Sequence, residues 1–322
     1  MRAIDRADVS VVIPTTGRFE LSRAVDSVIV QTMPPREVVV VVDHPLFPPA
    51  VKAEQIEALR AKGIQYLEIR TTGSGGGSIA RNLGVQVASS SLIAFLDDDD
   101  EWFPGKLHTQ VPLLLEQLSA SDLVFAASAL VGRDSSGEYI WPRYHPSEYR
   151  TIAEYLFCRR GLFQGDGIVQ TSTLLVPRSL LLRHPFTPGL ARHQDNDWVI
   201  RAMEEWKTRI VFCMEPLSVY NVAASSVSSG KSNILPSVQW IDSVRGLVSR
   251  RAYSAFLLTF VIQRMGRRDL LALPSVLRRA VFVGRPKGRD LAGGLVFLLT
   301  TRRLRAWLRS AASTARSRRS HN

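Results

Sequence analysis

The chain of 322 residues contains little cysteine and no long apolar run. Its two cysteines, Cys158 and Cys213, are too few for a disulfide framework or a four-thiolate zinc site, so we expect two reduced thiols. The longest apolar stretches, 252–262 and 291–300, are shorter than the roughly 18–20 residues that cross a bilayer. The N-terminus lacks the apolar core of an export signal. These absences predict a cytoplasmic protein.

Acidic residues are almost missing from the last quarter of the chain. Residues 245–322 contain 18 Lys and Arg but only Asp269 and Asp290, whereas residues 1–244 have a net charge of −4. A basic segment favours polyanions, either nucleic acid or the anionic face of a membrane. We expect basic helices at 238–322 that lie on a membrane surface, the alternative being a solvated helical cap on the rest of the protein.

Apolar runs alternate with segments of helical periodicity in the first part of the chain, which predicts an α/β fold with a parallel sheet. The Ser- and Gly-rich segment 223–237 predicts a linker, and 141–170 shows no clear periodicity. The expected strands cover 9–14, 37–42, 64–69, 92–96, 123–130, 174–177, 209–214 and 217–220. The expected helices cover 21–31, 50–61, 78–88 with Ser78 as N-cap, a segment from about 104, and 197–206.

Four aspartates and Glu101 follow the expected strand 92–96 directly. Five adjacent carboxylates repel one another unless a cation or hydrogen-bond donors compensate, and carboxylate oxygens are ligands for Mg²⁺ or Mn²⁺. The alternative is a solvated acidic loop before the next helix. The position at the carboxyl end of a strand, where open α/β sheets bind ligands, favours a metal held by Asp97 and Asp99.

Other polar groups are expected at the same edge of the sheet. Thr15 ends the first strand, and Asp43 ends the second, where it would either bind a nucleoside or cap a turn. The glycine-rich segment 71–78 precedes a helix and reads either as an anion-binding nest or as a flexible loop. Arg81, just inside that helix, favours a phosphate ligand.

The segment RHQDNDW (192–198) places polar groups before a helix. Asp195 is either a general base or a helix cap, and chemistry alone favours the cap.

Taken in order, these segments resemble the family 2 glycosyltransferases, which have the GT-A fold. The resemblance covers residues 8–222 and rests on VSVVIPTTGR, AVDSVIVQTMPPREVVVVVD, SIARNLGVQVASSSLIAFLDDDDEWFPGKLHTQ, RHQDNDWVIRA and EPLSVY. It implies a mixed, mainly parallel sheet with helices on both faces, and inverting transfer of a sugar from a nucleotide-diphosphate sugar to an acceptor hydroxyl. The implied roles are nucleobase binding for Thr15 and Asp43, ribose binding for Asp98, metal binding for Asp97 and Asp99, and base catalysis for Asp195.

The sequence also departs from the family pattern. Thr16-Gly17 replaces an aromatic-Asn pair, Val42-Asp43-His44-Pro45 stands where the family has Asp-Asp-Gly-Ser and so keeps only one carboxylate, and Gln194 replaces a glutamate. These departures leave the identity of the nucleotide open. The sequence also leaves open the sugar, the acceptor, and whether the product is a polysaccharide, a lipid-linked intermediate or a glycoprotein. We expect synthesis of a surface polysaccharide or glycolipid, on a saccharide or lipid-linked acceptor.

The predicted organisation is a transferase domain at 1–222, the linker at 223–237 and the basic helical region at 238–322. The alternatives are a nucleotidyltransferase, which also uses acidic residues at strand ends, and a non-enzymatic nucleic-acid-binding protein. The net charge of −4 over residues 1–244 argues against nucleic acid as a partner of that part.

Overall fold

The computed structural model describes residues 6–45, 50–134, 137–161, 166–221 and 233–299. The chain forms two compact units, which are described separately. The sheet unit consists of Met1–Arg133, Tyr139–Pro142 and Val169–Val222. The helical unit consists of Asp134–Glu138, Arg143–Ile168 and Ala223–Asn322. Residues 143–168 therefore group with the C-terminal helices, whereas the sequence analysis placed them in the first domain.

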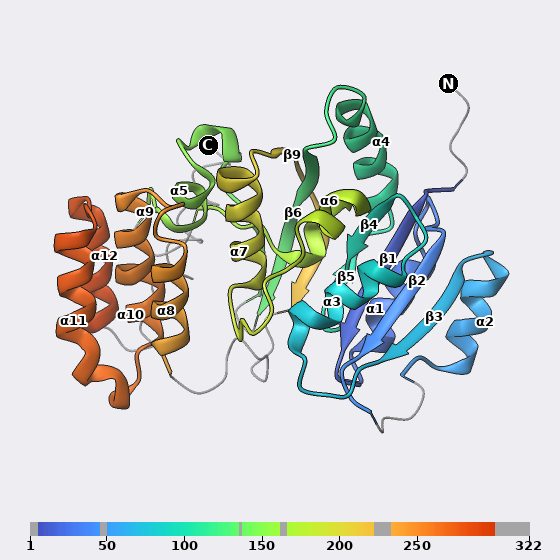
Figure 1. Cartoon of the computed structure of the whole chain (residues 1–322), viewed down its shortest axis with the longest axis horizontal. Helices are drawn as coiled ribbons and strands as arrows, with labels where there is room; N and C mark the ends of the chain where they lie inside the picture. The colour runs from blue at the N-terminus through green and yellow to red at the C-terminus, as the bar shows by residue number, and fades with distance from the viewer. Residues whose placement is uncertain (1–5, 46–49, 135–136, 162–165, 222–232, 300–322) are drawn as a thin grey trace. The chain divides into compact units, whose positions relative to one another are not determined.

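The sheet unit is built on a nine-stranded sheet with the order β3-β2-β1-β4-β8-β6-β9-β5, and β7 pairs with β6. Figure 1 shows β3, β2, β1 and β4 side by side in this order. The pairs β1–β2, β2–β3, β1–β4 and β6–β9 are parallel, and β4–β8, β6–β8 and β5–β9 are antiparallel. The strands are β1 (Val9–Thr15), β2 (Glu37–Val42), β3 (Gln65–Arg70), β4 (Leu92–Phe95), β5 (Glu101–Trp102), β6 (Val124–Asp134), β7 (Gly137–Trp141), β8 (Leu175–Pro177) and β9 (Arg209–Asn221).

Helices cover both faces of this sheet, which is why the valine-rich strands β1 and β2 are apolar on both sides. One face packs against α1, α2 and α4 in a single core that includes Val11, Val40 and Leu107. On the other face α3 comes so close to β1 that a Cβ at Gly84 would lie 2.4 Å from Val12 Cγ1. The helices of the unit are α1 (Leu21–Ile29), α2 (Ala53–Ala61), α3 (Gly76–Val87), α4 (Lys106–Leu118), α6 (Arg178–Arg183) and α7 (Gln194–Ile200), with the 3-10 helix η2 (Thr171–Thr173) and the π-helix η3 (Arg201–Glu205), which continues α7.

Aromatic rings fill the second face next to β4 and β6. Phe186 meets Phe95 edge-on at 5.3 Å between centroids, and Trp198 of α7 meets Phe125 in the same way at 5.2 Å. Both Phe95 and Trp198 are almost fully buried. This packing fixes the start of α7, and with it Asp195, against the sheet.

Several predicted boundaries were wrong. Helix α3 begins at Gly76, with Gly75 as its N-cap, so Ser78 lies inside the helix and does not cap it. The segments 209–214 and 217–220 are one strand, β9, whose pairing with β6 shifts register beyond Ser128. Helix α8 begins at Leu235, inside the predicted linker.

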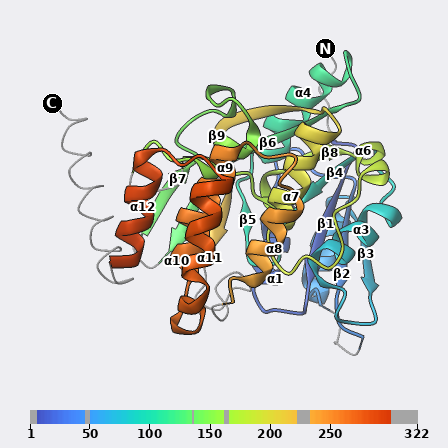
Figure 2. The ribbon, with the colours of Figure 1, turned by 60° about the vertical axis from the view of Figure 1, so that its left-hand side comes forward.

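The helical unit contains α5 (Ile152–Phe157) and a run of short helices after residue 233 (Figure 2). These are α8 (Leu235–Ser243), α9 (Arg250–Ala255), η5 (Phe256–Val261), α10 (Ile262–Arg264), η6 (Arg267–Ala272), α11 (Leu273–Arg278), η7 (Arg279–Val283) and α12 (Gly288–Leu299). The predicted helical C-terminal region is thus present. Over the part of the chain that the structure describes, every helix is too short or too polar to cross a membrane.

Candidate functional site

The carboxyl ends of β1, β2 and β4 meet at one edge of the sheet, as the sequence predicted. Thr15 is the last residue of β1, Asp43 follows β2 directly, and the acidic loop, residues 97–100, follows β4. Thr15 Oγ1 donates a hydrogen bond of 2.6 Å to Asp98 Oδ2, so the first and fourth strand ends are in direct contact. The structure therefore brings the predicted residues Thr15 and Asp98 together.

Two arginines neutralise part of the acidic loop. Arg18 Nη1 lies 3.0 Å from Asp99 Oδ2 and 3.7 Å from Asp98 Oδ1. Arg81 Nη2 pairs with Asp97 Oδ1. Burial raises the pKa of Asp98 to about 6, against the opposing effects of the Thr15 hydrogen bond and the Arg18 charge. Burial and repulsion by Asp97 also raise the pKa of Asp99. The loop thus retains unbalanced negative charge that a cation would relieve.

The acidic loop has the donor set that a magnesium or manganese ion requires. Among the described residues, no three His, Cys, Asp or Glu side chains converge as a ready-made metal site. Such an ion is typically held by only one or two carboxylates together with substrate phosphates. Asp97 and Asp99 supply carboxylates of this kind, and part of each side chain is accessible. The residues present therefore fit a divalent ion that is shared with a phosphate ligand.

Asp100 has a different role from its three neighbours. It is almost fully buried, and its carboxylate accepts hydrogen bonds from Gln170 Nε2 at 2.6 Å, Ser172 Oγ at 2.7 Å and the Asn221 backbone N–H at 3.2 Å. Ser172 Oγ also accepts the backbone N–H of Asp97 at 3.0 Å. Asp100 thus anchors the loop to the turn before β8 and to the end of β9.

Sequence reasoning missed this anchor. Gln170 and Ser172 lie in QTST, which matches no functional motif, and Asn221 was only the residue after an expected strand. Lys106 of α4 in turn contacts the segment that contains Gln170 and Ser172. Its Nζ donates hydrogen bonds to the Thr173 carbonyl at 3.2 Å and to Gln110 Oε1. A buried lysine of this kind gives no signal in the sequence.

Asp43 organises the glycine-rich loop. Its carboxylate accepts the backbone N–H groups of Gly75 at 3.2 Å and Gly76 at 2.8 Å, and the Thr71 hydroxyl. Burial alone would raise the pKa of Asp43, but these hydrogen bonds outweigh it and lower the pKa below its ordinary value. Of the two alternatives, the turn cap is present in the structure. Binding of a nucleoside by Asp43 stays a prediction.

Arg81 links the acidic loop to the helix that carries Asp195. Its Nη1 donates to Gln194 Oε1 at 2.7 Å, and the Arg81 side chain is buried. Helix α7 has His193, in a left-handed conformation, as its N-cap residue, so Asp195 lies in the first turn and is not the cap. Burial raises the pKa of Asp195 to about 6. A carboxylate with this pKa, beside an arginine that contacts the acidic loop, is suited to accept a proton near neutral pH.

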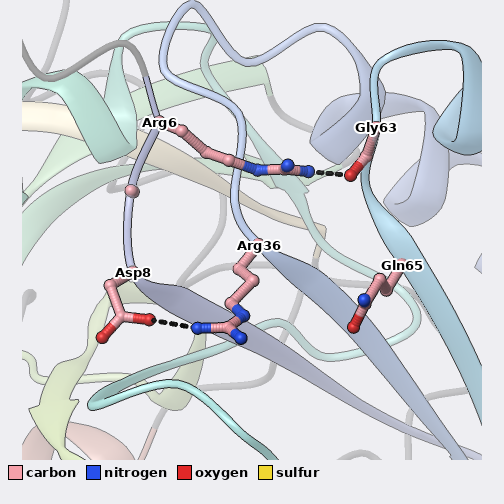
Figure 3. Close-up of a pocket in the computed structure, with 6 residues that line it drawn as sticks. Arg6, Asp8, Arg36, Gly63 and Gln65 are labelled. Atoms are coloured by element: carbon pink, nitrogen blue, oxygen red, sulfur yellow. Dashed lines mark hydrogen bonds and ion pairs between the residues drawn. The ribbon is translucent and has the colours of Figure 1, made fainter.

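A hollow of about 420 Å³ lies at the opposite edge of the sheet, at the amino ends of β1, β2 and β3 (Figure 3). The charged groups in it are already paired within the protein. Arg36 Nη1 lies 3.5 Å from Asp8 Oδ1, and Arg6 donates to the Gly63 carbonyl. None of the predicted site residues lines this hollow. The carboxyl edge with the acidic loop is therefore the candidate site.

The chain is similar in sequence to known glycosyltransferases. The sequence model described as "Glycosyl transferase family 2" matches residues 10–181, just over half of the chain. The amylovoran biosynthesis glycosyltransferase AmsB of Erwinia amylovora is 28% identical over 82% of this chain and 87% of its own length. The UDP-Glc:alpha-D-GlcNAc-diphosphoundecaprenol beta-1,3-glucosyltransferase WfgD of Escherichia coli is 24% identical over 69% of this chain and 80% of its own length.

Solved structures share the fold. TarS of S. aureus in complex with UDP-GlcNAc superposes with a TM-score of 0.57 at 16% identity, over 90% of each chain. The mannosyltransferase PcManGT from Pyrobaculum calidifontis, in complex with GDP-Man and Mn²⁺, gives 0.51 at 16% identity, over 96% of this chain and 81% of that one. These matches confirm the predicted fold class: a GT-A type, mainly parallel mixed sheet with helices and a helical C-terminal region.

Proposed function

Because this chain belongs to glycosyl transferase family 2, we propose that it transfers a hexose, with inversion, from a nucleotide-diphosphate sugar to an acceptor hydroxyl. The observation that supports this most strongly is the convergence at one sheet edge of the acidic loop with Thr15, Arg81 and helix α7. The structural relatives bind UDP-GlcNAc and GDP-Man, which supports a nucleotide sugar as donor.

The donor nucleotide binds along the carboxyl ends of β1, β2 and β4. In this proposal Thr15 and Asp43 hold the nucleobase, and Asp98, which Thr15 fixes, faces the ribose. Arg81 contacts both Asp97 of the acidic loop and Gln194 of α7, which supports its guanidinium as the group that binds a donor phosphate. Asp43 shapes the glycine-rich loop at the same time, because its carboxylate accepts the N–H groups of Gly75 and Gly76.

A divalent ion, Mg²⁺ or Mn²⁺, would be held by Asp97 and Asp99 and would supply positive charge to the diphosphate leaving group. The presence of Mn²⁺ in the PcManGT complex supports this requirement. Arg18 and Arg81, which pair with the same carboxylates, keep these side chains in place before the donor binds.

Asp195 is the general base. It accepts the proton of the acceptor hydroxyl while that oxygen attacks the anomeric carbon and the bond between this carbon and the diphosphate oxygen breaks. A single attack from the face opposite the leaving group inverts the anomeric centre and requires no covalent intermediate on the protein. The raised pKa of Asp195 makes its carboxylate a stronger base than an exposed aspartate.

The product is a surface polysaccharide or glycolipid. AmsB is named for amylovoran biosynthesis, and the acceptor in the name of WfgD is a diphosphoundecaprenol-linked sugar. Both names support a saccharide or a lipid-linked saccharide as the acceptor of this chain.

The test is a screen of UDP and GDP sugars with Mn²⁺, read out as nucleotide release that depends on a saccharide acceptor. Asp195→Asn should keep donor binding, measured by calorimetry, and lose transfer by about 100-fold or more, as expected for removal of a general base. The matched control is Glu204→Gln, a carboxylate-to-amide change later on the same helical segment. Loss of donor affinity in Asp195→Asn with unchanged turnover would overturn the role of Asp195. Absence of release with every donor would overturn the transferase proposal.

A further inference from the structure

We propose that the helical unit binds an anionic lipid bilayer through one exposed surface on η6, α11 and η7. We call this surface the basic apolar face and define it by Leu270, Leu271, Arg278, Val281, Phe282 and Arg285. The proposal is independent of the transfer chemistry, because all of these residues lie outside the sheet unit.

Large apolar side chains are unusually exposed on this face. The exposed fractions are 94% for Leu271, 76% for Phe282, 52% for Leu270 and 45% for Val281. Single exposed apolar residues are ordinary, but several within about 12 positions indicate an interaction surface. Exposure of Phe282 is costly in water, and burial in an apolar phase would recover that cost.

Helical periodicity places these side chains together. Leu271, Arg278 and Phe282 follow one another at intervals of seven and four positions, so they share one side of the continuous helical segment η6–α11–η7. Arg285 follows the end of this segment, after Gly284. The opposite side carries Val276 and Ala280, which are almost fully buried, and the segment packs through it on α9 and η5. Figure 2 shows α11 beside α10 in the helical unit. The exposed face is therefore set by the packing of the unit.

The charge on this face matches an anionic surface. Arg278 and Arg285 are exposed and form no ion pair among the described residues, and exposed Lys287 and Arg289 follow directly. Within the described ranges, the two acidic residues of the segment 245–322, Asp269 and Asp290, do not form ion pairs with these basic side chains. Asp290 is 2% exposed, and Asp269 accepts the Gly266 backbone N–H at 2.9 Å.

The combination of apolar and basic side chains on this face favours an anionic bilayer over nucleic acid as its partner. Arginines flanking exposed leucine and phenylalanine are typical of helices in a membrane interface, where the apolar side chains enter the lipid and the cations contact the headgroups. Nucleic acid would use Arg278 and Arg285 but would leave Leu271 exposed. Pairing of two copies through this face would bring like charges together.

The experiment is co-sedimentation of the full chain with phosphatidylcholine vesicles that contain 30 mol% phosphatidylglycerol, compared with pure phosphatidylcholine. We expect binding to the anionic vesicles at 0.1 M NaCl and at least tenfold weaker partitioning at 0.5 M NaCl, because salt screens the headgroup attraction. The double variants Leu271→Ser/Phe282→Ser and Arg278→Glu/Arg285→Glu should each weaken partitioning tenfold or more.

The matched controls lie in the sheet unit. Arg60→Glu/Lys62→Glu changes the same charge at two exposed positions at the end of α2, where Lys62 is the C-cap residue, and Leu67→Ser removes an apolar side chain that is 40% exposed. Both should bind vesicles like the wild type. Thermal melting of each variant verifies folding, and two separate double variants keep the test informative if one fails to fold.

Four results would overturn the proposal. The first is equal sedimentation of the wild type with and without vesicles. The second is unchanged binding in both double variants. The third is salt-dependent binding to a single-stranded RNA probe without vesicle binding, which would assign the cations to nucleic acid. The fourth is a dimer that Phe282→Ser disrupts, which would assign the face to a second copy. Donor-dependent nucleotide release, measured on the same samples, separates these outcomes from failure of the transferase proposal.

Discussion

Lys106 should make the stability of this protein depend on pH in a way that can be calculated from the structure. Its side chain is fully buried, and burial lowers its pKa from 10.5 to about 7. A tenfold change in proton affinity corresponds to about 1.4 kcal/mol, so the charged form is disfavoured in the folded protein by roughly 5 kcal/mol at most. The two acceptors around it, Gln110 Oε1 and the Thr173 carbonyl, match the two N–H groups of a neutral amine.

The sign follows from proton linkage. Between pH 7 and 10.5 the folded protein holds Lys106 neutral while the unfolded chain still binds the proton, so the free energy of unfolding rises with pH. The slope is about 1.4 kcal/mol per pH unit over this window and vanishes below and above it. Replacement by Met keeps the length of the side chain and removes the titration.

We therefore expect the free energy of unfolding of Lys106→Met, minus that of the wild type, to be largest at pH 7. The difference should decrease by about 1.4 kcal/mol per pH unit toward pH 10. Loss of the hydrogen bond to Gln110 adds a cost of about 1–3 kcal/mol that does not change with pH. The test is therefore how this free-energy difference changes with pH. Whether the difference is positive or negative at a single pH does not test the reasoning.

The assay is equilibrium unfolding in urea at pH 7, 8, 9 and 10, with Lys62→Met as a control that removes an exposed lysine. The contribution of every other titrating group cancels in the comparison with the wild type. A difference for Lys106→Met that stays constant from pH 7 to 10 would refute the reasoning, because it would mean that the buried lysine remains protonated in the folded protein.

Three further outcomes follow from the site and its supports. The plot of kcat/KM against pH should have an acidic limb near pH 6, with activity lost as pH falls, because Asp195 acts as a base only when it is deprotonated; a rate that is flat from pH 5 to 8 would argue against this. Asp99→Asn should lower transfer and Mn²⁺ affinity, measured by calorimetry, by about 100-fold or more, while the melting temperature holds or rises because repulsion by Asp97 is relieved; full activity would remove Asp99 from the metal site. Gly84→Ala should destabilise the protein by about 1–3 kcal/mol despite its better helix propensity, because the new methyl would lie 2.4 Å from Val12 Cγ1; a higher melting temperature would contradict this.

The parallel core of the sheet could be predicted because its strands are locally encoded. The run Glu37–Val42 is buried on both faces, and a run of valines between two helical segments is typical of a central parallel strand. By contrast, β5 has two residues, Glu101–Trp102, and exists only through its pairing with β9 more than 100 positions later. Nothing local distinguishes such a strand from the acidic loop before it.

The candidate site divides in the same way. The position of the four aspartates after an apolar strand was enough to predict the edge of the sheet that they share with Thr15, and the structure adds the hydrogen bond between Thr15 and Asp98. The sequence could not show which aspartate turns inward, because four identical residues differ only in their surroundings. Asp100 is the aspartate that turns inward, because its carboxylate accepts hydrogen bonds from residues 70 to 121 positions away in the chain.

The anchors of the acidic loop lie close to points where the chain passes between the two units. The chain returns from the helical unit to the sheet unit at Val169 and leaves it again after Val222. Gln170, one residue after the return, and Asn221, one residue before the departure, both donate to the carboxylate of Asp100. Asn221 Nδ2 also donates to the backbone carbonyl of Asp99 at 2.9 Å. Two donors that fix Asp100 therefore lie within two residues of a point where the chain passes from one unit to the other, so the order of the acidic loop depends on the segments at which the sheet unit is entered and left.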